Sequence, residues 1–167
     1  MSVFYLDTSV IVKRYRTEEG TEFVDMLFDK VIDTKEHSLV TSTISILEYV
    51  AAMRRIQKAN IISEDDFNDA ISIFRKDMDH FSLRPFNDEL LAKTINVVMD
   101  HALRTVDSIH LATVLELKEM MAKIDEDTIL VSNDNEMCDA AKKEDLAVLK
   151  PADKDKLISM LDDSQNE

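Results

Sequence analysis

Short apolar runs alternate along the chain with longer stretches of helical periodicity. Each run has three or four residues and few polar side chains, which is typical of strands buried on both faces of a sheet. The runs lie at residues 3–6, 38–41, 83–86, 128–131 and 147–149. Because Pro85 has no N–H group to donate, the third run can form only an edge strand or a connecting segment.

The stretches between these runs predict helices, since apolar residues recur there every three or four positions. These helices cover residues 8–15, 18–32, 42–59, 63–81, 87–101, 105–121 and 135–144, and Pro151 opens a terminal helix. Strands separated by helices predict an α/β fold, here a three-layer α/β/α sandwich around a central, mainly parallel sheet of about four to five strands. We expect a single domain over residues 1–161 and a flexible acidic tail over residues 162–167.

Several helix starts carry side chains that can accept hydrogen bonds from free backbone N–H groups. The expected caps are Thr8 or Ser9, a capping box of Ser63 with Asp66, then Asn87 and Thr105. In the helix over residues 42–59, the face expected to point inward consists of Ile44, Leu47, Ala51 and Ile56.

A single glycine and a single cysteine in 167 residues exclude several kinds of site. Gly20 alone cannot supply the glycine-rich loops that bind dinucleotides or phosphates. Cys138 alone allows neither an internal disulfide nor a pair of zinc-binding cysteines, and we interpret it as a small buried hydrophobic residue rather than a nucleophile. Charge enters at Asp7, and no apolar run approaches the roughly 18 residues of a membrane span, so we expect a cytoplasmic protein.

The formal net charge is −14, and most of the acidic excess lies after residue 60. Such a surface repels polyanions. One interpretation is that the acidity serves solubility. The other is that some of the carboxylates converge to bind a metal ion.

Four acidic residues stand at positions that favour the second interpretation. Asp7 and Asp134 follow strands, and ligands of open α/β sheets bind beyond the carboxyl ends of strands at a switch point in strand order. Glu48 and Asp107 lie in helices beside apolar positions, where a carboxylate is costly to bury without a partner. Each has an alternative: Asp7 and Asp134 as helix caps, Asp107 as a first-turn acid, and Glu48 as an exposed flank.

Four segments of the chain resemble the PIN-domain nucleases, and especially the VapC-like toxins of toxin–antitoxin pairs. Each contains one of the four acids, and Ser42 and Ser45 precede Glu48 by the family's spacing. The segments are YLDTSVIVKRY from Tyr5, TSTISILEYV from Thr41, LRTVDSIHLATVL from Leu103 and LVSNDNEMCDAAKKEDLAVLKP from Leu130. They come in the family's order, although Asp145 lies where family members usually have a glycine.

The resemblance implies an endoribonuclease that depends on Mg²⁺ or Mn²⁺. Asp7, Glu48, Asp107 and Asp134 would form its catalytic and metal-binding pocket, and Thr8 or Ser132 would help to place metal or phosphate. Carboxylate oxygens are the ligands that these hard cations prefer. A metal-bound water can then act as the nucleophile, so no serine, cysteine or histidine nucleophile is required.

The resemblance also implies partners: an RNA substrate, with tRNA among the structured RNAs to consider, a small antitoxin protein, and a second copy of the chain in a homodimer. Antitoxins of this family often place an arginine against the acidic pocket. Arg54, Arg55 and Lys58 follow Glu48 on its helix and are candidates to bind the RNA backbone, or else a solvated helix face.

Other functions remain open from the residues alone. The chain could be a non-catalytic PIN module that binds proteins through residues 43–81, or a stand-alone RNA-processing nuclease. A phosphatase of the haloacid-dehalogenase type requires a second aspartate where this chain has Ser9. His110, three residues after Asp107, is either a soft metal ligand or a partly buried structural histidine.

Overall fold

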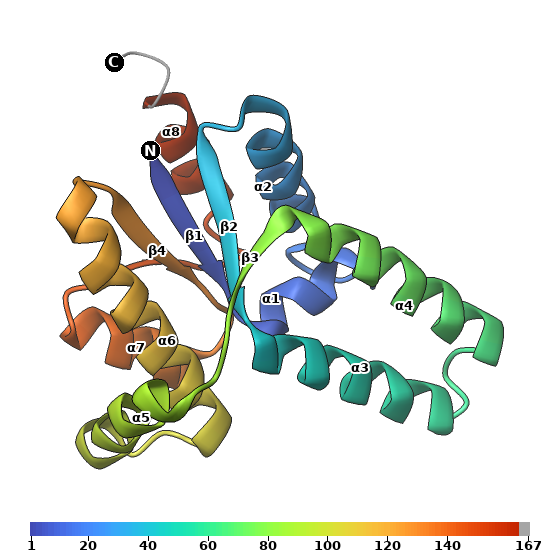
Figure 1. Cartoon of the computed structure of the whole chain (residues 1–167). Coiled ribbons are helices and arrows are strands. Elements are labelled where there is room, and N and C mark those ends of the chain that lie inside the picture. The colour runs from blue at the N-terminus through green and yellow to red at the C-terminus, as the bar shows by residue number, and fades with distance from the viewer. Residues whose placement is uncertain (164–167) are drawn as a thin grey trace.

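Five parallel strands form the centre of the protein in the computed structural model, which describes residues 1–163 (Figure 1). They are β1 Ser2–Leu6, β2 His37–Ser42, β3 Phe81–Arg84, β4 Asp127–Val131 and β5 Ala147–Leu149. Their order in the sheet is β3-β2-β1-β4-β5. The predicted parallel sheet is confirmed, and β3 is an edge strand that ends just before Pro85, as the missing N–H group requires.

Helices cover both faces of this sheet, which confirms the three predicted layers (Figure 1). One core lies between the sheet and α1 Thr8–Ile11, α2 Thr21–Thr34 and α8 Lys154–Asp163. The other lies between the sheet and α5 Asp88–His101, α6 Thr105–Met121 and α7 Asn135–Lys143. Because successive side chains of a strand point to opposite faces, Phe4 joins the first core and Tyr5 the second.

Two further helices, α3 Thr43–Lys58 and α4 Glu64–Asp77, form a hairpin that projects from the sheet (Figure 1). The rings of Tyr49 and Phe74 stack across the hairpin with their centroids 3.9 Å apart, and Tyr15 packs edge-on against both rings. Short 3-10 turns follow α1, α4 and α6 at Val12–Arg14, Met78–His80 and Ala122–Ile124. The aromatic cluster therefore fixes the base of the hairpin to the segment that follows β1.

The caps of α4 and α5 are confirmed, and two others are corrected. The capping box of Ser63 and Asp66 is present, and Asn87 accepts from the N–H group of Leu90. Asp7, rather than Thr8 or Ser9, caps α1, because its carboxylate accepts from the N–H group of Val10. Arg104, rather than Thr105, occupies the cap position of α6, and Thr105 is the first residue of that helix.

The inward face of α3 also differs from the prediction. Leu47 is 68% exposed and Ala51 is exposed, whereas Ser45, Tyr49 and Met53 are buried. The physical reason is that the hydroxyl of Ser45 is satisfied inside the protein by Thr41, 2.7 Å away. A hydrogen-bonded serine can occupy a core position that its polarity argues against.

The strand order reverses between β1 and β4, and this switch point fixes where a site can form. From β1 the chain continues to β2 and β3 on one side, and then returns to β4 and β5 on the other. The N–H group of Asp7 donates to the carbonyl of Val131, 3.2 Å away, so the two strand ends lie side by side. The crevice beyond them is where open α/β sheets bind ligands.

No helix of residues 1–163 combines the length and apolarity needed to cross a membrane. The expected tail, residues 162–167, begins in the last turn of α8 and otherwise lies outside the described residues. Asp145, at the position where the resembling family usually has glycine, has a φ of 52°, a left-handed conformation that aspartate tolerates better than most residues.

Gly20 takes its cap position before α2 with a φ of 91°. A Cβ atom there would lie 2.5 Å from the Cβ atom of Pro151. We therefore expect Gly20→Ala to lower the free energy of unfolding by about 2 kcal/mol through backbone strain and overlap, measured by urea denaturation. Asp145→Gly, which relieves a left-handed residue but adds freedom to the unfolded chain, should shift it by less than about 0.5 kcal/mol. Equal stability of Gly20→Ala and wild type would contradict this account.

Candidate active site

Asp7 is a buried carboxylate at the carboxyl end of β1, with 4% of its surface exposed. One of its oxygens accepts from the N–H group of Val10, and the Ser9 hydroxyl lies 2.7 and 3.0 Å from the two oxygens. Ser132 donates to the second oxygen at 2.7 Å. Burial nevertheless raises the pKa of Asp7 above its usual range, against the charge of His110 and these hydrogen bonds. A cation beside Asp7 would reverse this effect.

Ser132, which directly follows β4, connects Asp7 to Asp134. Its hydroxyl donates to Asp7 and accepts from the N–H group of Asp134, 3.0 Å away. Asp134 caps α7, because its Oδ1 atom accepts from the N–H group of Met137 at 2.8 Å. The sheet therefore places the two acids on adjacent strand ends, each at the start of a helix where the dipole favours negative charge.

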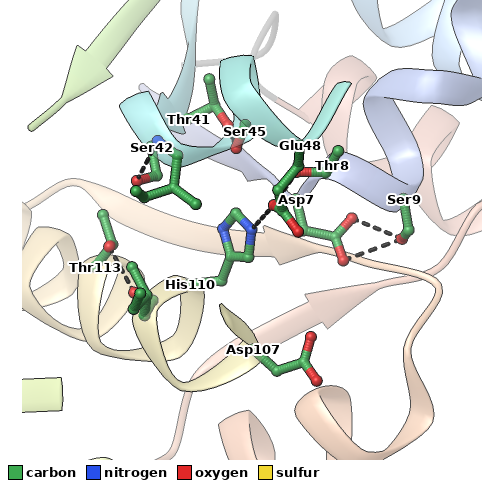
Figure 2. A network of polar contacts seen from close by, with 12 residues as sticks. Asp7, Thr8, Ser9, Thr41, Ser42, Ser45, Glu48, Asp107, His110 and Thr113 are labelled. Atoms are coloured by element: carbon green, nitrogen blue, oxygen red, sulfur yellow. Dashed lines mark hydrogen bonds and ion pairs between the residues drawn. The ribbon is translucent and has the colours of Figure 1, made fainter. Parts of the chain in front are cut away.

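Glu48 lies on α3 and reaches the same region through two hydrogen bonds (Figure 2). It accepts from the hydroxyl of Thr8, the neighbour of Asp7, and it lies 2.8 Å from Nε2 of His110. Burial alone would raise the pKa of Glu48, but the hydrogen bonds from His110 and Thr8 and the charges of His110 and Arg55 lower it. Glu48 is therefore held as a carboxylate.

His110 is buried on α6 between Glu48 and Tyr5. Because an ionised carboxylate can only accept, Nε2 of His110 carries a hydrogen and donates to Glu48. Its other ring nitrogen, Nδ1, lies 2.8 Å from the hydroxyl of Tyr5, whose pKa burial raises. Of the two interpretations of His110, its burial and its contacts with Glu48 and Tyr5 agree with the structural histidine, and it orients Glu48.

Asp107 and Asp134 are joined by a cation. Arg104 donates from Nε to Oδ2 of Asp107 at 2.7 Å and from Nη2 to Oδ2 of Asp134 at 3.0 Å. Asp107 lies in the first turn of α6, three residues before His110, and Figure 2 shows it apart from Asp7 and Glu48. Ser132 and Arg104 thus connect Asp7, Asp134 and Asp107, whereas Glu48 is connected to Asp7 through Thr8, the next residue in the chain.

The donor set suits a hard divalent cation, because all four side chains offer carboxylate oxygens. In residues 1–163, however, no three acidic, histidine or cysteine side chains are grouped closely enough to hold a metal ion as they stand. Arg104 supplies the reason for part of this: it holds Asp107 and Asp134 with a positive charge of its own. The chemistry of the residues fits the cation, and its binding requires rearrangement of these side chains.

The three basic candidates on α3 have different surroundings. Arg54 forms an ion pair with Glu64 at 3.0 Å, and its guanidinium lies over the ring of Phe67. Arg55 is exposed, and its charge contributes to the lowered pKa of Glu48. Lys58 is exposed in the last turn of α3. Arg55 is therefore the candidate whose charge reaches the acidic site.

Surface hollows lie both beside Asp134 and elsewhere on the molecule. A cavity of about 550 Å³ lies beside Asp134 and is lined by Arg104, Asn133, Asp134, Asn135 and Glu136. Another, of about 500 Å³, includes His37 and Ser38 at the start of β2. Because the acids lie at the carboxyl ends of the strands, that second cavity is at the opposite end of the sheet.

Cys138 is buried, as predicted, and burial raises the pKa of its thiol.

Arg104 and the orienting role of His110 were missed from the sequence. Both form contacts across 30 or more residues, which no local pattern reveals. A signal for Arg104 was nevertheless present. A basic residue at the start of a helix opposes the helix dipole, so its side chain is expected to find a carboxylate partner.

Comparison with known proteins gives one result for nearly the whole chain. The family described as PIN domain matches residues 4–143. Ribonuclease VapC35 of Mycobacterium tuberculosis is 29% identical over 149 residues, which cover 89% of this chain and 97% of that protein.

Solved structures share the fold. FitAcB from Neisseria gonorrhoeae superposes with a TM-score of 0.64 and 20% identity, covering 90% of this chain and 99% of that one. VapBC2 from Rickettsia felis, solved with a DNA fragment from its promoter, gives a TM-score of 0.57 and 12% identity, covering 89% of this chain and 98% of that one.

The raised pKa of Asp7 predicts that this carboxylate destabilises the metal-free protein. A group that is protonated more readily in the folded state costs no stability below the ordinary aspartate pKa of about 3.9, and the full cost is present above the folded-state pKa. We expect Asp7→Asn to raise the free energy of unfolding by about 1 kcal/mol at pH 7.5 in EDTA.

Denaturant titrations at several pH values measure this gain, which should shrink as the pH falls toward 4. Asp139→Asn, a control that removes an exposed carboxylate of α7, should change stability by less than about 0.5 kcal/mol. A less stable Asp7→Asn protein at pH 7.5 would contradict the cost assigned to Asp7.

Proposed function

The chain belongs to the PIN domain family, and we propose that it is a metal-dependent endoribonuclease that acts as the toxin of a toxin–antitoxin pair. The observation that carries this proposal is the set of contacts around the switch point of the sheet: Ser132 binds Asp7 and Asp134, Arg104 binds Asp134 and Asp107, and Thr8, the neighbour of Asp7, binds Glu48. Helix capping accounts for Asp7 and Asp134 but not for Glu48 and Asp107, and placing further carboxylates around the same crevice adds repulsion between like charges. The similarity to Ribonuclease VapC35 supports RNA as the substrate.

The four acids would hold Mg²⁺ or Mn²⁺. When bound, such an ion supplies an activated water and neutralises charge on the phosphate. The residues around the acids prepare them for that ion: Ser9 and Ser132 fix the oxygens of Asp7, and Thr8 and His110 both hold Oε2 of Glu48. We therefore assign Thr8 and Ser132 a positioning role through the carboxylates that they bind.

RNA would approach across the open side of the site, and we propose that Arg55 and Lys58 bind its backbone. Both are exposed on α3, the helix that carries Glu48. Arg54 contributes less, because Glu64 and Phe67 already hold its guanidinium. Phosphate contacts of this kind position the RNA without reading its sequence.

An antitoxin partner and a homodimer complete the proposal. Similarity to chains of the VapBC and FitAB complexes supports a small protein partner. The net charge of −14 favours a partner that presents basic side chains to the acidic site. A stripe of exposed apolar side chains along α5 supports contact with a second copy, and its members are Leu91, Ile95, Val98 and Met99.

The first experiment incubates the protein with structured RNAs, tRNA included, in Mg²⁺, Mn²⁺ or EDTA, beside Asp7→Asn and the control Asp139→Asn. We expect cleavage by wild type and the control in either metal, and at least a hundredfold loss in EDTA and in Asp7→Asn, because the ion's contribution is lost. Mn²⁺ should also raise the melting temperature of wild type but not of Asp7→Asn.

The outcomes separate the alternatives. Cleavage that persists in EDTA, or an equal rise in melting temperature for Asp7→Asn, would refute the metal site. Absence of both cleavage and metal binding would instead favour a non-catalytic module that acts through its helical hairpin. Cleavage confined to one precursor RNA would favour a stand-alone processing nuclease over a toxin.

The basic face of α3 provides a second test. Arg55→Gln should weaken binding of a single-stranded RNA about threefold and reduce the dependence of its affinity on salt by about 0.7 logarithmic units per decade, because one phosphate contact is lost. The measurement is fluorescence anisotropy at several salt concentrations. Arg54→Gln, with the same charge change on the same helix, should have a smaller effect. A larger effect of Arg54→Gln would place the RNA on the other side of α3.

A further inference from the structure

Arg104 holds a position inside the acidic site that the four-acid arrangement does not explain. Its guanidinium contacts both Asp107 and Asp134, although these acids come from different helices. The side chain is 74% exposed, whereas the two carboxylates are 18% and 24% exposed. An exposed cation thus covers two partly buried acids.

The oxygen that Arg104 occupies on Asp134 is the one that a metal ion would need. Oδ1 of Asp134 caps α7 through the N–H group of Met137, so only Oδ2 faces the site. That atom lies 3.0 Å from Nη2 of Arg104. A divalent cation at Oδ2 would repel the guanidinium, so the two positive groups compete for Asp134.

Release of Arg104 exposes no buried cation, because the guanidinium is already largely in solvent, and a divalent ion that replaces it keeps the two carboxylates matched by positive charge. The guanidinium already lines the cavity of about 550 Å³ at the start of α7, together with Asn133, Asp134, Asn135 and Glu136, so a phosphate in that cavity could reach it. Lys150 donates to Asn135 from the adjacent chain segment and adds a second positive charge there. A planar guanidinium at such a place suits bidentate binding of a phosphate.

We propose that Arg104 is an RNA phosphate-binding residue that Asp107 and Asp134 hold in reserve until a divalent cation displaces it. This rests on the proposed ribonuclease function. Metal binding then has two consequences at once: it completes the acidic site, and it frees the positive group that contacts the substrate backbone. Without metal, Arg104 remains on its carboxylates and contributes little to RNA binding.

Metal affinity gives the first readout, and it requires no RNA. Mn²⁺ binding is measured by calorimetry for wild type, Arg104→Gln, Arg104→Lys and Arg75→Gln, in which an exposed arginine of α4 is replaced. Arg104→Gln should bind Mn²⁺ about three- to fivefold more tightly, because the competitor is gone. Arg75→Gln makes the same change in net charge far from the site and should match wild type.

RNA affinity gives the second readout. The protein is titrated into a fluorescent polyuridylate of 20 nucleotides, once in Ca²⁺ and once in EDTA. Ca²⁺ also binds carboxylate oxygens, with a looser coordination than Mg²⁺. In Ca²⁺, Arg104→Gln should weaken binding about tenfold and lower its salt dependence by about 0.7 logarithmic units per decade. In EDTA the substitution should change affinity less than twofold. Arg104→Lys should retain part of the affinity in Ca²⁺, since its charge remains.

Two results would overturn the proposal. Weaker or unchanged Mn²⁺ binding by Arg104→Gln would mean that the arginine supports the carboxylates rather than competing with the metal. An equal effect on RNA affinity in Ca²⁺ and EDTA would mean that no displacement takes place. If wild type binds Mn²⁺ and cleaves RNA, either result removes only the role of Arg104. If wild type does neither, the ribonuclease function itself is refuted.

Discussion

Burial of the Asp7 carboxylate at the end of the central strand is the constraint on which the rest of the site depends. A buried carboxylate must be hydrogen-bonded or matched by a cation. Asp7 meets this requirement with Ser9 and the N–H group of Val10 on one side and Ser132 on the other. The contact with Ser132 joins the end of β1 to the end of β4, so Asp7 holds together the two strand ends at the switch point.

The two best-held carboxylates of the site are perturbed in opposite directions. Burial raises the pKa of Asp7, whereas hydrogen bonds from His110 and Thr8 lower that of Glu48. The difference follows from their surroundings, because Glu48 is only half-buried and has an imidazole N–H donor. Neighbouring groups whose pKa values are shifted in opposite directions are typical of functional sites. Here Glu48 stays charged, and Asp7 is the carboxylate whose charge a nearby cation would stabilise.

The sequence predicted the sheet and two of the acids because those features depend on local order. Apolar runs fixed the strands, and Asp7 and Asp134 follow two of them directly. The direction of the Glu48 side chain and the contact between Arg104 and Asp134 could not be predicted in this way, because both depend on which segments the fold brings together. The wrong prediction that Leu47 points inward has the same origin. Thr41 is hydrogen-bonded to Ser45 inside the core, so the buried face of α3 contains Ser45 and leaves Leu47 exposed.

Asp7 and Asp134 both cap helices, and this role is compatible with metal binding because capping uses only one of the two carboxylate oxygens. Each carboxylate uses one oxygen to accept from a helix N–H group, and its other oxygen is bound by side chains. The cap fixes the rotamer of the side chain, so the second oxygen is aimed without further ordering cost. That second oxygen is then satisfied by a neutral donor at Asp7, Ser132, and by a cation at Asp134, Arg104. A hydroxyl can stay beside a bound metal, whereas a guanidinium is repelled by it. Under the proposed metal-dependent function, this difference makes the Asp107–Asp134 side of the site the part that would rearrange around an ion, while the Asp7 side stays fixed by the sheet.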